Sequence, residues 1–533
     1  MPFRRLEHGL GTRMVLVAAL AGLGTAPTYA ANDNNNGHAQ VSGEVQHDTL
    51  HSLRGTMPRP DDFSKNPHAH PLHPMPYLGS PGNAADPVVQ ATATAAATTS
   101  HSNFNGVGVG FGNFAVNSAP PDTNGAVGAT QYVQIVNTSF AVFDKTTSNV
   151  LYGPVGINTL WSGFGGPCEA DNDGDPIVSY DKAAGRWIIT QFAVTATPYM
   201  QCVAVSASND ATGAYYRYAF SYGSVFPDYP KLGVWPDAYY ITFNMFNGNS
   251  FQGARLCAYN RQAMLQGTAA SQQCFQLSSS YGSVLPADLD GNTAPPAGAP
   301  NYLVDFTTGR LNLWRFHVDW SNSANTQLSG PTAIPVAAFT PACNGATCIP
   351  QYGVSQKLDS LADRLMYRLA YRNFGNHEAL LVNHSVQVSS SRRDQHSGIR
   401  WYELRNPGGT PVVYQQSTYS PDSSYRWMGS AAMDKQGNIA VGYSVSSSSL
   451  HPAIRYTGRL ATDALNTLQA ETSLIEGRGS QTGYNLSRWG DYSAMQVDPV
   501  DDCTFWYTSE YLNANGAFNW STRIASFKFP SCQ

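Results

Sequence analysis

The stretch IVSYDKAAGRWIITQFAV, from Ile177 to Val194, contains two strand-like runs joined by a polar turn. The runs IVSYD and WIITQFAV are rich in β-branched and aromatic residues, and KAAG supplies turn residues between them. Two more runs of the same kind follow, CVAVSAS from Cys202 and YYRYAFS from Tyr215. We therefore expect four short antiparallel strands that together form one small sheet.

The same unit recurs after residue 120 at intervals of about 50 to 75 residues. Each copy places a polar turn with an Asp or Arg ahead of a small-residue strand, and a strongly β-prone strand follows. These β-prone strands begin at Tyr132, Trp187, Tyr239, Tyr302, Leu365, Asn438 and Phe505. Repeats too small to bury their own faces are typical of radially stacked sheets. The sequence predicts an all-β fold, a seven-bladed β-propeller of four-stranded antiparallel blades, over residues 101–533.

A β-sandwich and a parallel β-helix also consist of many short strands. A β-helix has a much shorter repeat, and a sandwich rarely exceeds about 250 residues as one domain, so a propeller is favoured. The stretch SNFNGVGVGFGNFAVN from Ser102 alternates apolar and small residues but has no local partner. We expect it to complete the last blade beside STRIASFKF from Ser521, because closing the ring protects an exposed strand edge.

Residues 1–30 have the pattern of a secretory signal peptide, since Arg4, Arg5 and Arg13 precede the apolar run MVLVAALAGL from Met14. Residues 31–100 are rich in His, Pro, Ala and Thr and show little apolar periodicity, which predicts a flexible propeptide or linker. No other apolar run approaches the roughly 20 residues that span a bilayer. We expect a secreted monomer, extracellular or periplasmic.

The composition fits short exposed strands, with 13% charged and 12% aromatic residues, 29 Tyr and 48 Gly. A net charge of −5 provides no field for holding nucleic acid or an anionic membrane. The expected partner is instead a glycan or another small extracellular ligand, without an organic cofactor.

Eight cysteines in an exported chain indicate four disulfides, although eight cysteines allow about 105 pairings. Proximity along the chain and blade position favour the pairs Cys168–Cys202, Cys257–Cys274, Cys343–Cys348 and Cys503–Cys532. The last pair would fix the C-terminus to the last blade.

Alignment of the units by their first strands brings one polar position per blade into register. These positions are Asp122, Asp175, Asp228, Asp288 or Asp290, Asp359, Arg426 and Asp491, with Arg488 just before the last. The turns before the innermost strands of a propeller converge at one end of its channel. Carboxylates gathered there raise one another's pKa and can serve as acid and base. The alternative is that each Asp only caps its turn through the backbone.

The motif DNDGD places Asp171, Asp173 and Asp175 around a glycine. Hard oxygen ligands on a turn suit Ca²⁺, so these residues form a candidate calcium site. The alternative is an acidic turn that is simply solvated.

A second repeated Asp lies beyond the first strand, at Asp181, Asp237, Asp434 and Asp498. These turns resemble the Asp-box of sialidase-like propellers, which is a structural motif on the face away from the active site. The chain is also similar to secreted bacterial propellers of unassigned function that share PPDTNGAVG and RWGDYS. The sialidase resemblance implies an arginine cluster for a substrate carboxylate, for which Arg368, Arg426, Arg455 and Arg488 are candidates. Glu510 and Tyr511 are adjacent on a strand and point to opposite faces, so they do not replace the sialidase nucleophile pair.

The leading hypothesis is an exported glycoside hydrolase whose acid and base, or nucleophile, are two of Asp122, Asp175, Asp228, Asp359 and Asp491. Arg368, Arg426 and Arg488 would position the sugar by charge, and Trp427 and Trp489 by stacking. One alternative is a non-catalytic carbohydrate-binding or adhesion propeller. A further alternative is a polysaccharide lyase or a calcium-dependent lactonase.

Overall fold

The computed structural model describes residues 37–59, 67–70, 73, 75–76, 84–112, 114–391 and 393–533. The predicted signal peptide, residues 1–30, lies outside the described residues. The described part belongs to one compact unit, Asn35–Gln533. It is an all-β structure in which the helices are short: α1 (Gly166–Ala170), α2 (Arg261–Gln266), and the 3₁₀ segments η1 (Ile157–Trp161), η2 (Ser323–Asn325) and η3 (Ala342–Gly345).

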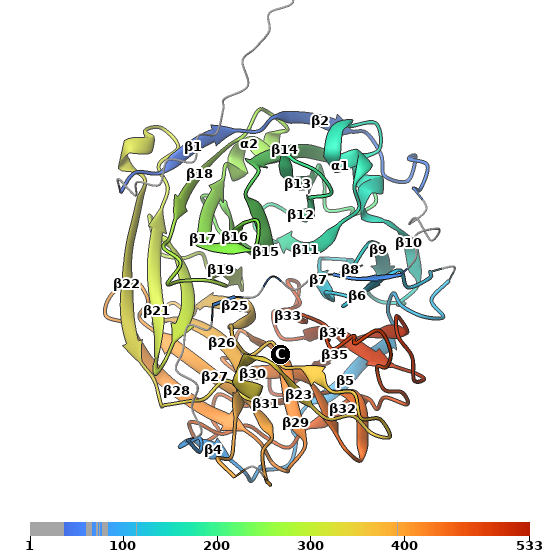
Figure 1. Ribbon diagram of the computed structural model, residues 1–533. Helices are drawn as coiled ribbons and strands as arrows, with labels where there is room; N and C mark the ends of the chain where they lie inside the picture. The colour runs from blue at the N-terminus through green and yellow to red at the C-terminus, as the bar shows by residue number, and fades with distance from the viewer. Residues whose placement is uncertain are drawn as a thin grey trace, which may run out of the picture. The chain divides into compact units, whose positions relative to one another are not determined.

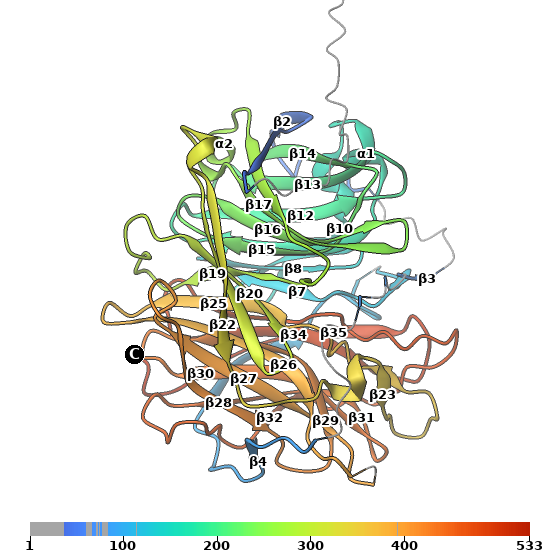
Figure 2. The ribbon, with the colours of Figure 1, turned by 60° about the vertical axis from the view of Figure 1, so that its left-hand side comes forward.

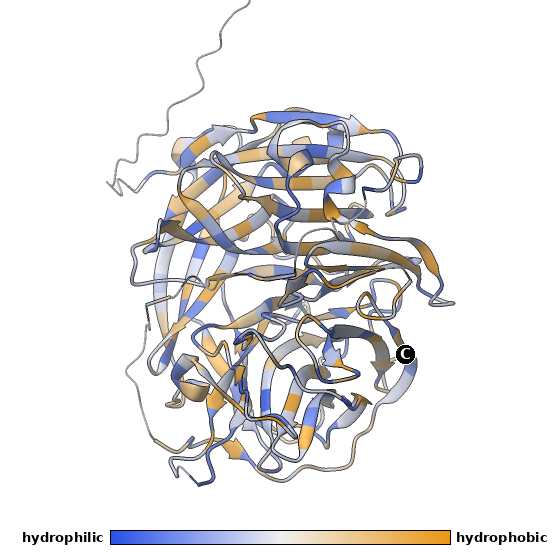
Figure 3. Cartoon of the chain, turned by 45° about the vertical axis from the view of Figure 1, so that its right-hand side comes forward, coloured by the Kyte–Doolittle hydropathy of each residue, from blue (hydrophilic) through white to orange (hydrophobic). Residues whose placement is uncertain are grey.

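The quoted stretch forms the first two strands of an antiparallel sheet, as the sequence predicts. This sheet contains β11 (Gly174–Asp181), β12 (Arg186–Ala193), β13 (Tyr199–Ser206) and β14 (Tyr215–Gly223) in chain order. The turn KAAG connects Asp181 to Arg186, which lie opposite each other in the register of β11 and β12. Hydrophobic and hydrophilic residues are interleaved along such strands in Figure 3, which fits sheets that are packed through side chains on their faces.

The same antiparallel order of consecutive strands recurs along the described chain. The further groups are β7 (Asn124–Val127), β8 (Gln131–Val136), β9 (Ser139–Asp144) and β10 (Val150–Gly156); β15 (Phe226–Val234), β16 (Tyr239–Asn247), β17 (Ser250–Tyr259) and β18 (Ser271–Gln276); β19 (Leu285–Asp290), β20 (Asn301–Thr307), β21 (Arg310–His317) and β22 (Gln327–Pro335); β25 (Met366–Asn373), β26 (Glu378–Gln387), β27 (Ser397–Arg405) and β28 (Val412–Tyr419); β29 (Tyr425–Met433), β30 (Ile439–Ser447), β31 (Leu450–Arg459) and β32 (Thr472–Ile475); and β33 (Ala494–Val497), β34 (Phe505–Leu512) and β35 (Trp520–Lys528).

The first strands of these groups form a closed circuit of contacts. In chain order β7, β11, β15, β19, β25, β29 and β33 each contact the next, and β33 contacts β7. The step from β19 to β25 is a parallel pairing, which merges two groups into one nine-stranded sheet. In Figure 1, β7, β11, β15, β19 and β33 lie nearer the middle than β2, β10, β22 and β28, and Figure 2 gives the turned view.

Each group has a non-glycine residue with positive φ within or shortly before its first strand. These residues are Asp122, Asp175, Tyr229, Ser283, Leu361, Met428 and Asp491, with φ between 44° and 56°. In β11, β15 and β29 the residue lies in a β-bulge, where the register with the second strand shifts. The Asn137 side chain accepts a hydrogen bond from the Asp175 amide at 3.0 Å, and the Asn244 side chain accepts one from the Ser283 amide at 2.7 Å. Neighbouring groups are thereby joined at the start of their first strands.

Aromatic side chains fill the core between neighbouring sheets. The rings of Tyr132 on β8 and Trp506 on β34 are stacked with their centroids 5.2 Å apart. Trp235 and Tyr371 meet edge to face at 4.6 Å. Such pairs contribute about 0.5–1.5 kcal/mol each beyond the burial of their area.

The last group is completed by a strand from the N-terminal part, as predicted. Strand β5 (Thr99–Asn105) pairs antiparallel with β35, with Asn105 opposite Arg523. The remaining short strands are β3 (His68–Ala69), which pairs with β6 (Ser118–Ala119), and β23 (Thr347–Ile349), which pairs with β24 (Leu358–Asp359).

The segment of residues 31–100 differs from the flexible linker that we expected, where it is described. Strand β1 (Gln40–Gly43) pairs with β18, β2 (Gln46–Leu50) with β14, and β4 (Val89–Gln90) with β28. Pairing with a sheet edge uses backbone groups and does not require an apolar repeat in the added strand. Composition therefore did not reveal these strands.

All four predicted disulfides are confirmed: Cys168–Cys202, Cys257–Cys274, Cys343–Cys348 and Cys503–Cys532. Cys257 on β17 lies directly opposite Cys274 on β18. Among the described residues, no helix is both long and apolar enough to cross a lipid bilayer.

Candidate functional site

Asp122 and Asp175 occupy the same backbone position in successive groups, the positive-φ residue at the start of the first strand. Aspartate adopts this conformation more readily than most residues because its short polar side chain can bond locally. Asp122 is 2% exposed and Asp175 is 8% exposed. Two carboxyl groups are therefore held together away from water.

The carboxyl groups of Asp122 and Asp175 interact directly, and burial raises the pKa of both. Burial raises the pKa of Asp122 well above its usual range, and the charge of Asp175 raises it further. Burial also raises the pKa of Asp175, and the charges of Lys231 and Arg488 partly offset this. The two side chains are hydrogen-bonded to each other. Like charges in contact raise the cost of ionising both groups, so the pair resists losing both protons.

Asp228 on β15 is the most accessible member of this cluster. Burial, followed by the charge of Asp175, raises the pKa of Asp228 to about 7. Its side chain is 20% exposed, and its Oδ2 lies 3.7 Å from Nδ1 of His73. A carboxyl group that titrates near neutral pH and reaches the surface can donate a proton to a bound molecule.

Lys231, which sequence reasoning missed, lies beside the paired carboxyl groups. Its ammonium lies 3.4 Å from the centre of the Tyr229 ring and 3.9 Å from that of Tyr492, and it donates to the Pro230 carbonyl at 2.9 Å. Burial lowers the pKa of Lys231 to about 7, against the opposing charges of Asp175 and Asp122. A lysine in the otherwise apolar run KLGVW was the available signal.

Two arginines border the cluster, and each is engaged by a neighbouring carboxylate. Arg488 Nε donates to Asp491 at 2.8 Å, and Nη2 also contacts that carboxylate. Arg364 donates to Asp363 at 2.7 Å and 3.0 Å, with its guanidinium 4.4 Å from the centre of the Tyr229 ring. Asp491 thus lies in the cluster as an ion-pair partner.

Asp359 lies at the border of this cluster. Burial raises its pKa, although it accepts hydrogen bonds from the Leu361 amide at 2.8 Å and the Thr347 hydroxyl at 3.1 Å. Its own amide donates to the Ser487 carbonyl at 2.8 Å, next to Arg488. The structure therefore brings Asp122, Asp175, Asp228 and Asp491 together, and Asp359 contributes mainly to the loop that carries Arg488.

The prediction that Arg368 binds substrate is wrong. Arg368 is fully buried and forms ion pairs with Asp288 at 2.7 Å and Asp290 at 2.6 Å. Both carboxylates lie on β19, which is paired with the strand of Arg368. The Arg368 guanidinium therefore links β25 to β19 and has no hydrogen-bonding face directed to a substrate.

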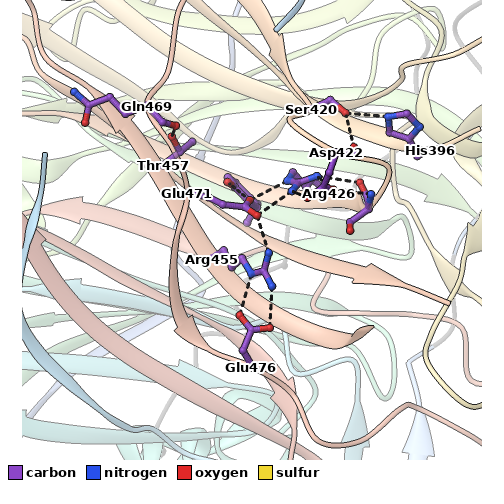
Figure 4. A network of polar contacts seen from close by, with 11 residues as sticks. His396, Ser420, Asp422, Arg426, Arg455, Thr457, Gln469, Glu471 and Glu476 are labelled. Atoms are coloured by element: carbon purple, nitrogen blue, oxygen red, sulfur yellow. Dashed lines mark hydrogen bonds and ion pairs between the residues drawn. The ribbon is translucent and has the colours of Figure 1, made fainter. Parts of the chain in front are cut away.

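The prediction for Arg426 is also wrong. Figure 4 shows Arg426 between Asp422 and Glu471, and Arg455 between Glu471 and Glu476. Arg426 has no exposed side-chain surface. This network holds β29, β31 and the segment before β32 together, so neither arginine is available to a substrate carboxylate.

Trp427 and Trp489 do not form the predicted stacking surface. Both are 0% exposed, and their ring centroids lie 6.1 Å apart. Trp489 also donates to the Ser444 hydroxyl at 3.1 Å. Large aromatic rings next to a first strand are drawn into the core between sheets, because that burial is strongly favourable.

The carboxylates of Asp173 and Asp175 do not converge on one point. Asp173 accepts hydrogen bonds from the amides of Val194 at 2.6 Å and Thr195 at 2.9 Å, whereas Asp175 belongs to the cluster with Asp122. Asp171 is the third member of the predicted calcium site. Within the described ranges, no group of three His, Cys, Asp or Glu residues is placed to hold a metal ion.

Asp181, Asp434 and Asp498 of the second repeated set cap turns, as the Asp-box resemblance implies, whereas Asp237 accepts a hydrogen bond from the Tyr240 hydroxyl at 3.2 Å. The Asp434 carboxylate accepts from the amides of Gln436 and Asn438, both at 2.9 Å, and Asp498 accepts from the Val500 amide at 3.0 Å. Glu510 and Tyr511 have separate partners: Glu510 accepts from the Gly490 amide at 2.7 Å, and Tyr511 donates to Asn105 at 3.3 Å. They cannot act as a nucleophile pair.

No protein-family model and no curated protein matches the sequence. Solved structures with similarity include the N-terminal domain of Nup159, with a TM-score of 0.36 and 8% identity over 84% of this chain and 100% of that one. A neuraminidase-like protein of subtype N10 from A/little yellow-shouldered bat/Guatemala/060/2010 has a TM-score of 0.30 and 10% identity over 64% and 95%. Trypanosoma rangeli sialidase has a TM-score of 0.29 and 12% identity over 66% and 54%.

Proposed function

We propose that this chain is an exported glycoside hydrolase built on a seven-bladed β-propeller. The closed circuit from β7 to β33 and back supports seven blades, each with its first strand innermost. Four disulfides support export, because such bonds persist in oxidising compartments.

The observation that carries the catalytic proposal is the pairing of an accessible carboxyl group that titrates near neutral pH, Asp228, with a deeper carboxyl group, Asp175. Asp228 is protonated up to about pH 7 and is partly exposed. It acts as the general acid that protonates the leaving oxygen. Asp175 is the negative partner that faces the developing positive charge of the sugar or activates the nucleophile.

Asp122 has a positioning role in this proposal. It is in hydrogen-bond contact with Asp175, whereas the two catalytic carboxyl groups of glycosidases lie at least about 5 Å apart. The catalytic pair is therefore Asp228 with Asp175. Asp122 orients Asp175, and the charge of Lys231 lowers the pKa of Asp175 against the effect of burial.

The substrate class is an uncharged sugar. Arg364 and Arg488 are bound to Asp363 and Asp491, and Arg368 and Arg426 are bound elsewhere. A sugar carboxylate would meet Asp122, Asp175 and Asp228 without a free guanidinium to balance its charge. This distinguishes the proposal from a sialidase.

The test compares Asp228→Asn and Asp175→Asn with Asp173→Asn on a panel of neutral and acidic glycans. The first two should lose at least about 100-fold in kcat, the usual contribution of a positioned acid or base. Asp173→Asn makes the same chemical change on the neighbouring loop and should retain turnover. Parental rates in both Asp228→Asn and Asp175→Asn would contradict the proposal, and binding of intact glycan without cleavage by the parent protein would favour a lectin-like function.

A further inference from the structure

Tyr484 lies on the loop that precedes Arg488 and presents its aromatic ring to solvent. With 84% of its surface exposed, it is the most exposed tyrosine among the described residues. Gly483, Tyr484 and Asn485 have φ angles of 81°, 52° and 52°, so three successive residues are left-handed. This conformation is unfavourable for residues that carry a Cβ, and the exposed ring recovers none of that cost through burial. Strain that is kept without a packing gain indicates a binding role for the ring.

Phe518, on the loop before β35, lies beside Tyr484. Its φ is 48°, its side chain is partly buried, and the two ring centroids lie 5.7 Å apart at an interplanar angle of 59°. The Thr482 amide donates to the Gly516 carbonyl at 3.0 Å, and the Gly516 amide donates to the Ser480 carbonyl at 3.2 Å. These backbone bonds join the two loops, so the two rings are held side by side.

A third loop is joined to the first by glutamine side chains. The Gln481 amide donates to the Gln351 side chain at 2.7 Å, and that side chain donates to the Gln481 carbonyl at 3.0 Å. The Gly483 amide also donates to the Gln356 side chain at 2.9 Å. Between Gln351 and Gln356 lies Tyr352, which is 50% exposed. A second exposed ring is therefore carried on a loop that is bonded to the first.

These three loops are residues 350–356, 480–487 and 513–519, and we call them the aromatic platform. They contain no Asp, Glu, Lys, Arg or His, and Ser355 and Asn485 are exposed on them. The apolar face of a sugar packs on an aromatic ring, and amide and hydroxyl side chains bond its hydroxyl groups. An uncharged surface provides no attraction for an acidic polymer or an anionic membrane. The ligand that this chemistry favours is a neutral carbohydrate.

The aromatic platform continues directly into the candidate catalytic site. Arg488 follows residues 480–487 in the chain, and its charge opposes the effect of burial, which raises the pKa of Asp175 and Asp228. The Ser487 carbonyl accepts a hydrogen bond from the amide of Asp359 at 2.8 Å, which fixes this end of the loop. The aromatic platform is therefore the surface next to the carboxylate cluster on the side of Arg488.

We propose that the aromatic platform binds further sugar units of a neutral glycan chain while the bond to be cleaved lies at Asp228. The inference rests on the proposed function, because it extends the same site and narrows the substrate to chains of several sugars. Tyr484 and Tyr352 each provide a stacking ring, and Phe518 supports the ring of Tyr484. Binding of these remote units positions the scissile bond at the carboxylates.

The experiment measures binding by native electrophoresis of the full chain in gels that contain galactomannan, xylan, mixed-linkage β-glucan or dextran. The variants are Tyr484→Ala, Tyr352→Ala and Tyr484→Phe, the last of which keeps the ring. Tyr414→Ala is the matched control, because Tyr414 is 39% exposed on β28, outside the aromatic platform. Nitration of Tyr484 by tetranitromethane, measured by peptide mass with and without polysaccharide, is a second readout that does not depend on turnover.

At least one of the four polysaccharides should retard the parent protein and slow the nitration of Tyr484. Tyr484→Ala should weaken the apparent Kd about tenfold, and Tyr352→Ala should weaken it in the same direction, as for exposed rings that become buried on binding. Tyr484→Phe and Tyr414→Ala should bind like the parent.

Equal retardation of the parent and Tyr484→Ala would overturn the aromatic platform, as would an equal loss in Tyr414→Ala or no retardation of the parent in any of the four gels. Turnover of the same polysaccharides separates this inference from the glycosidase proposal. If Tyr484→Ala loses binding but the parent cleaves none of them, the platform is supported and the glycosidase proposal fails. If the parent cleaves one of them and Tyr484→Ala does so with an unchanged KM, the glycosidase proposal stands and the platform is overturned.

Discussion

Lys231 places its ammonium 3.4 Å from the centre of the Tyr229 ring, beside the hydrogen-bonded carboxyl pair of Asp122 and Asp175. A ring face stabilises a cation without forming an ion pair, so the charge of Lys231 remains available to the carboxylates. Lysine and tyrosine lie two residues apart on β15 and are both fully or almost fully buried. This relationship makes Lys231 a positioning residue of the candidate site.

Lys231→Met should reduce kcat/KM by about tenfold or more, which is about 1.4 kcal/mol of transition-state stabilisation. The charge of Lys231 lowers the pKa of Asp175, so its removal should raise that pKa. Since the reaction requires ionised Asp175, the acidic limb of the pH–rate profile should move to higher pH. Lys435→Met, at an exposed turn, is the control and should leave the profile unchanged. An unshifted acidic limb in Lys231→Met would show that this charge does not act on Asp175.

The folded protein should lose stability as pH rises from about 4 to 7, because Asp228 binds its proton more tightly when folded. Its folded pKa is about 7 and its ordinary value is 3.8, so within this window the folded state holds a proton that the unfolded state releases. The free energy of unfolding should fall by up to about 1.4 kcal/mol per pH unit from this group alone.

Urea unfolding of the parent protein and Asp228→Asn at several pH values isolates this contribution. The variant should show a flatter dependence on pH across the window. Identical slopes in the two proteins would mean that Asp228 titrates near its ordinary pKa.

Three of the site aspartates could be predicted because the repeat fixes their backbone position. Asp122, Asp175 and Asp491 all occupy the positive-φ residue at the start of a first strand. In the β15 group that position belongs to Tyr229, and Asp228 lies one residue earlier. The alignment of the repeats therefore identified the correct turn in the β15 group but was displaced by one residue, from Tyr229 to Asp228.

The burial and the partners of the misassigned residues are determined by packing between sheets, which the sequence of one repeat does not reveal. Arg368 and Arg426 look like free cations in the sequence, but their partners Asp288 and Glu471 are 80 and 45 residues away. Trp427 and Trp489 meet only when neighbouring groups pack together. The recurring antiparallel strand groups and the cysteine pairs could be predicted because proximity along the chain determines both.

Glu471→Gln should destabilise the protein by about 3 kcal/mol, because it breaks a largely buried ion pair with Arg426 and Arg455. Asp422→Asn removes a partner that is 51% exposed and should cost less than about 1 kcal/mol. Thermal unfolding of both variants measures the difference, and neither should change kcat/KM. A loss of kcat/KM in Glu471→Gln without a loss of stability would show that Arg426 contributes to the activity.

Removal of the Cys503–Cys532 disulfide by double substitution to Ser should destabilise the protein by about 3.5 kcal/mol. Removal of Cys343–Cys348 should cost about 2 kcal/mol, because it closes a much shorter loop. The sequence separations are 29 and 5 residues, so the two variants differ mainly in the chain entropy that each bond removes. Chemical unfolding under non-reducing conditions compares them, and an equal or reversed order would argue against an entropic role for the C-terminal bond.

The decisive measurement for Asp228 as the general acid is the pH dependence of kcat/KM on a neutral glycan, since Asp228 must be protonated to act as the acid. The rate should decline above about pH 7, where Asp228 loses its proton, and Asp228→Asn should lack both this limb and most of the activity. Parental activity with an unchanged alkaline limb in Asp228→Asn would contradict this role of Asp228.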